Sequence, residues 1–158
     1  MTLPPDFPER AREAAAKFYA EQRLNCAESV FKAVVTSAGL PCPLELVRMA
    51  SSFGHGMGGA GCSCGSLVGA QLALGYFLGR AEETGRPPQQ CRDLAKVAHD
   101  RFVKINRVAC CRILLKGKVY GTPEQKESCA NHTREAAEIA ATIIMEALQQ
   151  NEETKSRD

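Results

Sequence analysis

Apolar residues recur at helical spacing along most of the chain, and the alternating β-branched runs that mark strands do not occur. The pattern predicts a short helical turn over residues 110–116 and six longer helices, over residues 8–23, 26–38, 43–53, 64–79, 88–106 and 123 (or 128)–150. Residues 151–158 are expected to form a frayed tail. The chain is therefore predicted to be all-α, with a single-domain helical bundle over residues 1–158 whose core covers about 8–150.

Local signals refine two of these helices. Asn25, with Glu28 three residues later, is typical of a capping box at a helix start, and Gly39 is typical of a left-handed helix end. The segment 64–79 carries pairs of glycines four residues apart, which allow close helix–helix approach. These glycine faces would serve either packing within the chain or the seam of a homodimer.

Composition narrows the class of protein. The 158 residues are 44% hydrophobic and 24% charged, with a net charge of +2, which is typical of a globular domain and does not suggest a nucleic-acid or anionic-membrane partner. The longest apolar segment, Leu67–Leu78, is too short for a membrane span, and the first residues do not resemble a secretory signal. We therefore expect a cytoplasmic protein, in which eight cysteines indicate metal, cluster or redox chemistry more than structural disulfides.

A glycine-rich loop runs from Gly54 into Cys62-Ser63-Cys64 and then into the apolar segment 65–78. It matches a dinucleotide fingerprint by letters, but no βαβ unit surrounds it. The loop would instead bring backbone close to a neighbouring helix or to a sulfur-ligated centre, and both alternatives stay open. The residues expected to approach such a centre are His55, as ligand or acid/base group, Cys62, and four glycines: Gly56, Gly58, Gly61 and Gly65.

Several cysteines fall near predicted helix starts, where unpaired N–H groups favour thiolate over thiol. They are Cys26, Cys62, Cys64 and Cys129, joined by the vicinal pair Cys110 and Cys111. Each could also be a buried apolar residue. We interpret Cys42 and Cys91 as incidental, and His99 and His132 as surface residues.

Standard cysteine spacings are missing. The chain has no Cys-x-x-Cys, so neither a thioredoxin-type dithiol nor a zinc ribbon is indicated, and no Cys-x-x-Cys-His for attached haem.

Three stretches together resemble the C_GCAxxG_C_C family of redox-active proteins. They are Asn25-Cys26-Ala27-Glu28-Ser29-Val30, the glycines of 54–58, and Cys64-Gly65-Ser66-Leu67-Val68-Gly69-Ala70. Two further segments, Cys111-Arg112-Ile113-Leu114-Leu115 and Cys129, extend the match, which covers about residues 11–148. The resemblance implies a redox role for four family cysteines, Cys26, Cys64, Cys111 and Cys129. It also implies a relationship to part of the split-Soret cytochromes, and an unknown redox partner that is associated with a transporter. The haem of those cytochromes is not expected here, because the haem-attachment motif is missing. Ser66 stands where the family usually has Ala, and Cys62 and Cys110 are additional, so that either could substitute for its neighbour as a ligand.

The sequence thus predicts that Cys26, Cys64, Cys111 and Cys129 converge under the glycine loop. Three versions stay open: electron transfer through a cysteine-ligated iron–sulfur cluster, dithiol/disulfide oxidoreductase chemistry, and a non-enzymatic module with structural zinc. In the first and third versions these four cysteines are the metal ligands.

Overall fold

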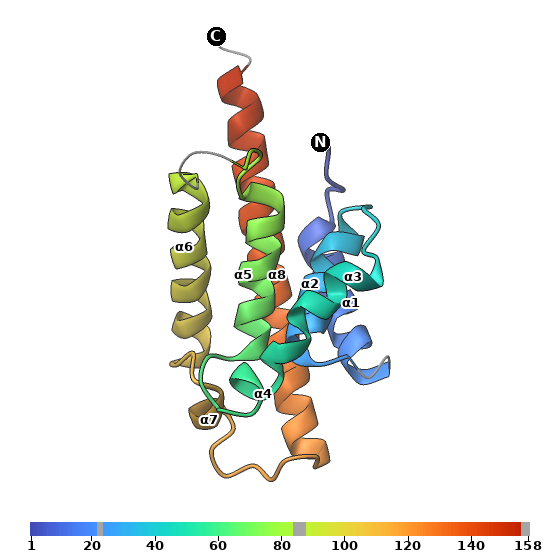
Figure 1. Cartoon of the computed structure of the whole chain (residues 1–158), viewed down its shortest axis with the longest axis vertical. Coiled ribbons are helices and arrows are strands. Elements are labelled where there is room, and N and C mark those ends of the chain that lie inside the picture. Colours follow the sequence, from blue (N-terminus) through green and yellow to red (C-terminus); the bar gives the residue numbers. More distant parts are fainter. Residues whose placement is uncertain (22–23, 84–87, 156–158) are drawn as a thin grey trace.

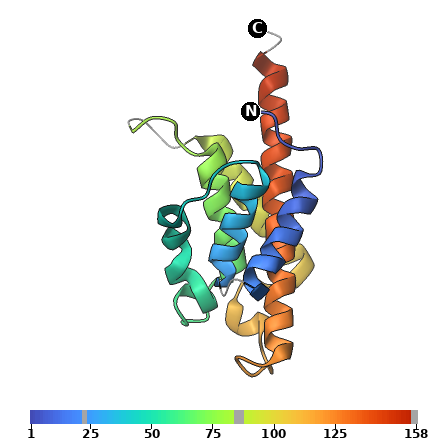
Figure 2. The same cartoon turned by 90° about the vertical axis from the view of Figure 1, so that its right-hand side faces the viewer.

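The computed structural model describes residues 1–21, 24–83 and 88–155. Within these ranges the chain is helical without strands, as predicted. Five longer helices form the bundle: α1 (Phe7–Glu21), α2 (Cys26–Ser37), α5 (Gly65–Leu78), α6 (Gln89–Asn106) and α8 (Pro123–Lys155). Figure 1 shows α5 between α6 and the α1–α2 pair, and Figure 2 shows α8 running the full length of the bundle.

The shorter helical elements lie at one end of the bundle and along one side of it. The segment predicted as one helix over 43–53 is instead α3 (Leu44–Val47) followed by the 3-10 helix η1 (Arg48–Phe53). The Gly54–Met57 element, α4, and α7 (Cys111–Leu114) lie together at the end opposite both termini (Figure 1). Leu44 and Met49 are 73% and 61% exposed, so this segment has too few buried apolar positions to hold a regular helix.

The last helix differs from the prediction at its C-terminal end. α8 continues through Lys155, so residues 151–155 are helical rather than frayed, and residues 156–158 lie outside the described part. Glu152 accepts a hydrogen bond from the N-terminal amine of Met1 at 3.4 Å, which ties the extended helix to the start of the chain. Residues 22 and 23 of the first predicted helix also lie outside the described residues.

The capping signals are confirmed. Asn25 Oδ1 accepts from the N–H groups of Ala27 and Glu28 at 2.9 and 3.0 Å, and Glu28 Oε2 accepts from the Asn25 N–H at 2.8 Å. Gly39, at φ 82°, follows the end of α2. These caps fix where α2 begins and therefore where Cys26 lies.

The core lies where α1, α2, α5 and α8 meet. α5 is apolar nearly all round and contacts α2, α8 and α6, as expected of a central helix. In the described residues, no helix is both long and apolar enough to cross a membrane.

Close packing of α5 on α2 depends on Gly69. A Cβ added there would lie 2.5 Å from Ala27 O and 2.9 Å from Val30 Cβ, whereas one added at exposed Gly75 of the same helix meets nothing within 4 Å. This face therefore serves packing within the chain, and a homodimer stays a prediction.

We expect Gly69→Ala to lower the free energy of unfolding by about 1–3 kcal/mol through overpacking. Its matched control, Gly75→Ala, should raise that free energy by up to about 1 kcal/mol because alanine favours the helix. Chemical denaturation of both variants tests this pair, and equal effects at the two positions would contradict the packing described.

Candidate cysteine centre

One buried cavity of about 30 Å³ brings together cysteines from four helical elements. Cys26, Cys64, Cys111 and Cys129 all line it, and each is at most 9% exposed. The six pairwise combinations of these thiols all interact electrostatically. The remaining lining residues are uncharged side chains or histidines: Tyr19, Asn25, His55, Ser66, Leu114, Leu115 and His132. The predicted convergence is thus present in the structure.

Cys26 is held between the start of α2 and the glycine loop. The His55 N–H faces the Cys26 sulfur and favours its ionised form. Gly65 packs so tightly against this thiol that a Cβ there would overlap Cys26 Sγ and lie 2.8 Å from Phe53 O. Here the backbone around the loop closely approaches both the start of α2 and the free Cys26 thiol.

Cys64 is the N-cap residue of α5. The N–H groups of Ser66 and Leu67 and the Ser66 side chain favour the ionised form of its thiol, and its own N–H donates to Ala109 O at 2.7 Å. Cys111 begins α7, where Gly56, at φ 66°, leaves room for it, because a Cβ on Gly56 would lie 2.7 Å from Cys111 Cβ. Two separate helix starts therefore deliver these sulfurs to the cavity.

Of the two predicted starts of the last helix, 123 and 128, the structure shows the first, so Cys129 does not lie at the helix start. α8 begins at Pro123, so the Cys129 N–H is inside the helix. Its sulfur instead accepts a hydrogen bond from Gln125 Nε2 at 3.0 Å. Tyr19 of α1 also hydrogen-bonds to Cys129, and burial together with the Cys129 charge raises the pKa of the Tyr19 phenol above its usual range.

Backbone N–H groups do favour the thiolate at Cys26 and Cys64, as expected, but burial outweighs them, so the pKa of both thiols is raised. Burial, followed by the charge of Cys64, raises the pKa of the Cys26 thiol to about 12, despite the opposing His55 N–H. Burial likewise raises the pKa of Cys64, and that of Cys111 to about 11. Desolvation is the largest cause, and repulsion between neighbouring thiolates raises the pKa of Cys26 and Cys111 further.

Two of the three histidines line the cavity, whereas the sequence had indicated only His55 as a functional residue. His55 lies in the loop at φ 56°, lines the cavity, and contacts the Tyr120 ring edge-on with 4.1 Å between centroids. His132 was expected at the surface but also lines the cavity, and desolvation lowers the pKa of its imidazole. His99 is exposed beside Asp100, as predicted.

Other candidate residues lie outside the cavity lining. Cys62 is exposed and Cys110 half-buried. A Cβ on Gly58 would face Ser52 O, and one on Gly61 would face the Arg112 side chain, so neither glycine contacts the four sulfurs closely. Cys42 and Cys91 are likewise absent from the lining.

A larger hollow of about 780 Å³ adjoins the cysteine cavity. The two share Tyr19, Asn25 and His55 in their linings. Tyr120, which is 68% exposed, and Lys126 lie on its outer side. Tyr19, Asn25 and His55 thus separate the cysteine cavity from this larger, more open hollow.

Sequence reasoning missed Tyr19, Gln125 and His132. Gln125 and His132 lie four residues before and three residues after Cys129, which is the spacing of neighbours on one helix face. The spacing of His132 from Cys129 is visible in the sequence, but one Cys-x-x-His pair is too weak a signal to outweigh a surface position. The spacing of Gln125 from Cys129 identifies it as a neighbour only if the helix starts at Pro123. Tyr19 carries no such signal, because its contact with Cys129 depends on how α1 packs on α8.

The burial of Cys26 leads us to a specific prediction for thiol reactivity. In the reduced, metal-free protein at pH 8, we expect exposed Cys62 to be alkylated much faster than buried Cys26. A thiol with a pKa of about 12 instead of 9 has roughly a thousandfold less reactive thiolate at that pH. Mass spectrometry of timed iodoacetamide reactions measures both rates, with urea-unfolded protein as the control in which they converge. Equal rates in the folded protein would contradict the burial of Cys26.

No curated protein and no solved structure matches this chain significantly. A model of the family described as "Putative redox-active protein (C_GCAxxG_C_C)" matches residues 24–143, which include all four cavity cysteines and the glycine loop. The chain therefore belongs to the C_GCAxxG_C_C family of redox-active proteins.

Proposed function

We propose that the protein transfers electrons through an iron–sulfur cluster held by Cys26, Cys64, Cys111 and Cys129. The observation that carries the proposal is that these four buried thiols share one cavity whose described lining contains no Lys or Arg. Four cysteine thiolates are the ligand set of both common cluster types.

Charge balance favours a bound metal centre over free thiolates. Reactive cysteines lie in electropositive, partly exposed surroundings, whereas these thiols are buried, and burial raises the pKa of Cys26 to about 12. Metal ions would supply the positive charge that the lining lacks, and a coordinating thiol loses its proton. The donor set therefore fits a cationic centre better than a dithiol nucleophile.

A single zinc ion and an iron–sulfur cluster require different arrangements of the four thiols. In the parts of the chain that the structure describes, no group of three His, Cys, Asp or Glu side chains is arranged to hold one metal ion. Ligands of a cluster bind different irons and need not point at a single atom.

The chain's own residues would tune such a centre. A bound cluster supplies a one-electron couple at the sulfurs. The N–H groups of His55, Ser66 and Leu67 face two of these sulfurs, and Gln125 donates to a third. Hydrogen bonds to ligating sulfur favour the more negative, reduced state. The adjoining hollow would let a redox partner approach within contact of His55 and Tyr19, which lie beside the sulfurs.

Anaerobic purification followed by a visible spectrum tests the proposal. We expect brown protein whose absorbance is bleached by dithionite and restored on reoxidation. Colourless protein with one zinc per chain would support the structural module instead. Colourless, metal-free protein whose thiol content falls and recovers on oxidation and reduction would support the dithiol alternative.

A further inference from the structure

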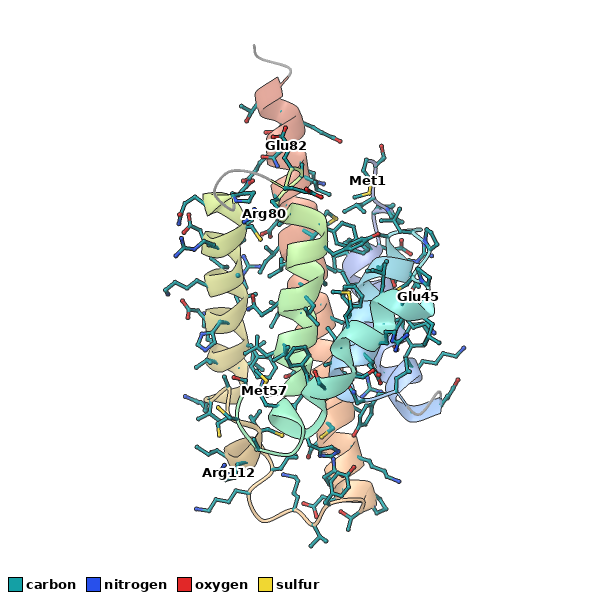
Figure 3. The ribbon with its side chains drawn as sticks, viewed as in Figure 1. Met1, Glu45, Met57, Arg80, Glu82 and Arg112 are labelled. Atoms are coloured by element: carbon teal, nitrogen blue, oxygen red, sulfur yellow. The ribbon has the colours of Figure 1, made fainter. Side chains whose placement is uncertain are left out.

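Two further cysteines, Cys62 and Cys110, lie outside the cavity lining, at the end of the bundle where α4 and α7 lie. Cys62 is exposed and Cys110 is half-buried, and neither lines the cavity. Figure 3 labels Met57 of α4 and Arg112 of α7, which mark the two segments that meet here. Ser63, at φ 47°, separates exposed Cys62 from buried Cys64.

Direct hydrogen bonds hold these two segments side by side. The Cys110 thiol donates to Gly61 O at 3.1 Å, so its sulfur lies against the peptide that joins Gly61 to Cys62. The Arg112 N–H donates to the same oxygen at 3.0 Å, and Arg112 Nη2 donates to Ala60 O at 2.7 Å. On the other side of Cys62, the Cys64 N–H donates to Ala109 O at 2.7 Å.

We propose that Cys62 and Cys110 form an outer redox pair that undergoes thiol–disulfide exchange with small organic disulfides. Exposed Cys62 attacks one sulfur of the disulfide, forming a mixed disulfide and releasing one small thiol. Cys110 then attacks the Cys62 sulfur, which forms the Cys62–Cys110 bond and releases the second thiol. The protein pair loses two electrons and two protons, and the small disulfide gains them as two thiols.

Because Cys62 and Cys110 precede two different helices, a disulfide between them would connect two parts of the cavity wall. The new bond would link the segment that precedes α5 to the segment that precedes α7, the two elements that present Cys64 and Cys111 to the cavity. The pair is separate from the four cavity cysteines, so this exchange does not depend on which centre they hold.

Peptide mapping after treatment with oxidised glutathione tests the pair. The reduced full-length protein is incubated anaerobically with oxidised glutathione, blocked with iodoacetamide and cleaved with trypsin. We expect a disulfide between the tryptic peptides 49–80, which contains Cys62 and Cys64, and 108–112, which contains Cys110 and Cys111. Cys62→Ser and Cys110→Ser should each reduce its yield at least tenfold, and Cys110→Ser should accumulate glutathione on Cys62.

Cys91→Ser is the matched control, because Cys91 is also a partly buried cysteine but lies in α6 and outside this contact. It should leave the yield unchanged. The proposal is overturned if the link survives in either variant of the pair, if Cys110 bonds to Cys111 within its own peptide, or if only glutathione adducts form. This experiment measures disulfide-linked peptides, whereas the proposed cluster is tested by metal content and visible absorbance. Either proposal can therefore fail without the other.

Discussion

Replacing Cys64 with serine is expected to reduce bound iron at least tenfold and to remove the visible absorbance of anaerobically purified protein. Cys64 is 4% exposed, lines the cavity and lies within electrostatic range of the other three thiols. A serine oxygen is a much poorer ligand for iron in a sulfur cluster than a thiolate. Iron and acid-labile sulfide per chain, together with circular dichroism to verify folding, measure the effect.

Cys62→Ser is the most informative control for that substitution. Cys62 lies two residues earlier in the same segment, but it is exposed and outside the cavity lining. We expect this variant, like Cys91→Ser, to retain its iron. The opposite result, loss of iron in Cys62→Ser and retention in Cys64→Ser, would mean that Cys62 is the ligand and that our assignment of the site is wrong.

The second large effect is expected from Gly65→Ala, which adds one methyl group next to a sulfur. The new Cβ would overlap Cys26 Sγ and lie 2.8 Å from Phe53 O, so α5, the Cys26 side chain or the η1 backbone must shift. We expect the free energy of unfolding to fall by about 1–3 kcal/mol and the iron content to fall several-fold. Denaturation curves and iron analysis of the same preparations measure both.

Gly75→Ala separates this steric effect from a general effect of alanine in α5. Its Cβ meets nothing within 4 Å, so iron content should stay at the wild-type level while stability is unchanged or higher. A Gly65→Ala protein with full iron content and unchanged stability would show that Gly65 does not need to be this close to Cys26.

Much of the fold followed from local signals in the sequence. The Asn25–Glu28 capping box and Gly39 correctly bounded α2, because these residues act on the backbone immediately beside them. The 43–53 segment was predicted less well, since its apolar residues suggested a buried helix face although Leu44 and Met49 are exposed. Its actual geometry depends on packing against α2, which one sequence does not specify.

The four cavity cysteines were predictable from the sequence, but Tyr19, Gln125 and the electrostatics of the cavity were not. The resemblance placed Cys26, Cys64, Cys111 and Cys129 together, and the structure brings them to one cavity. The ionisation argument failed because it considered each helix start alone. Burial depends on how the elements pack, and it dominates the pKa of Cys26.

Native mass spectrometry of the anaerobically purified chain tests most directly whether four cysteines hold one centre. We predict a mass excess equal to one iron–sulfur cluster per chain in the wild type and none in Cys64→Ser. A wild-type chain that carries only the mass of the bare polypeptide, or of a single zinc ion, would contradict it.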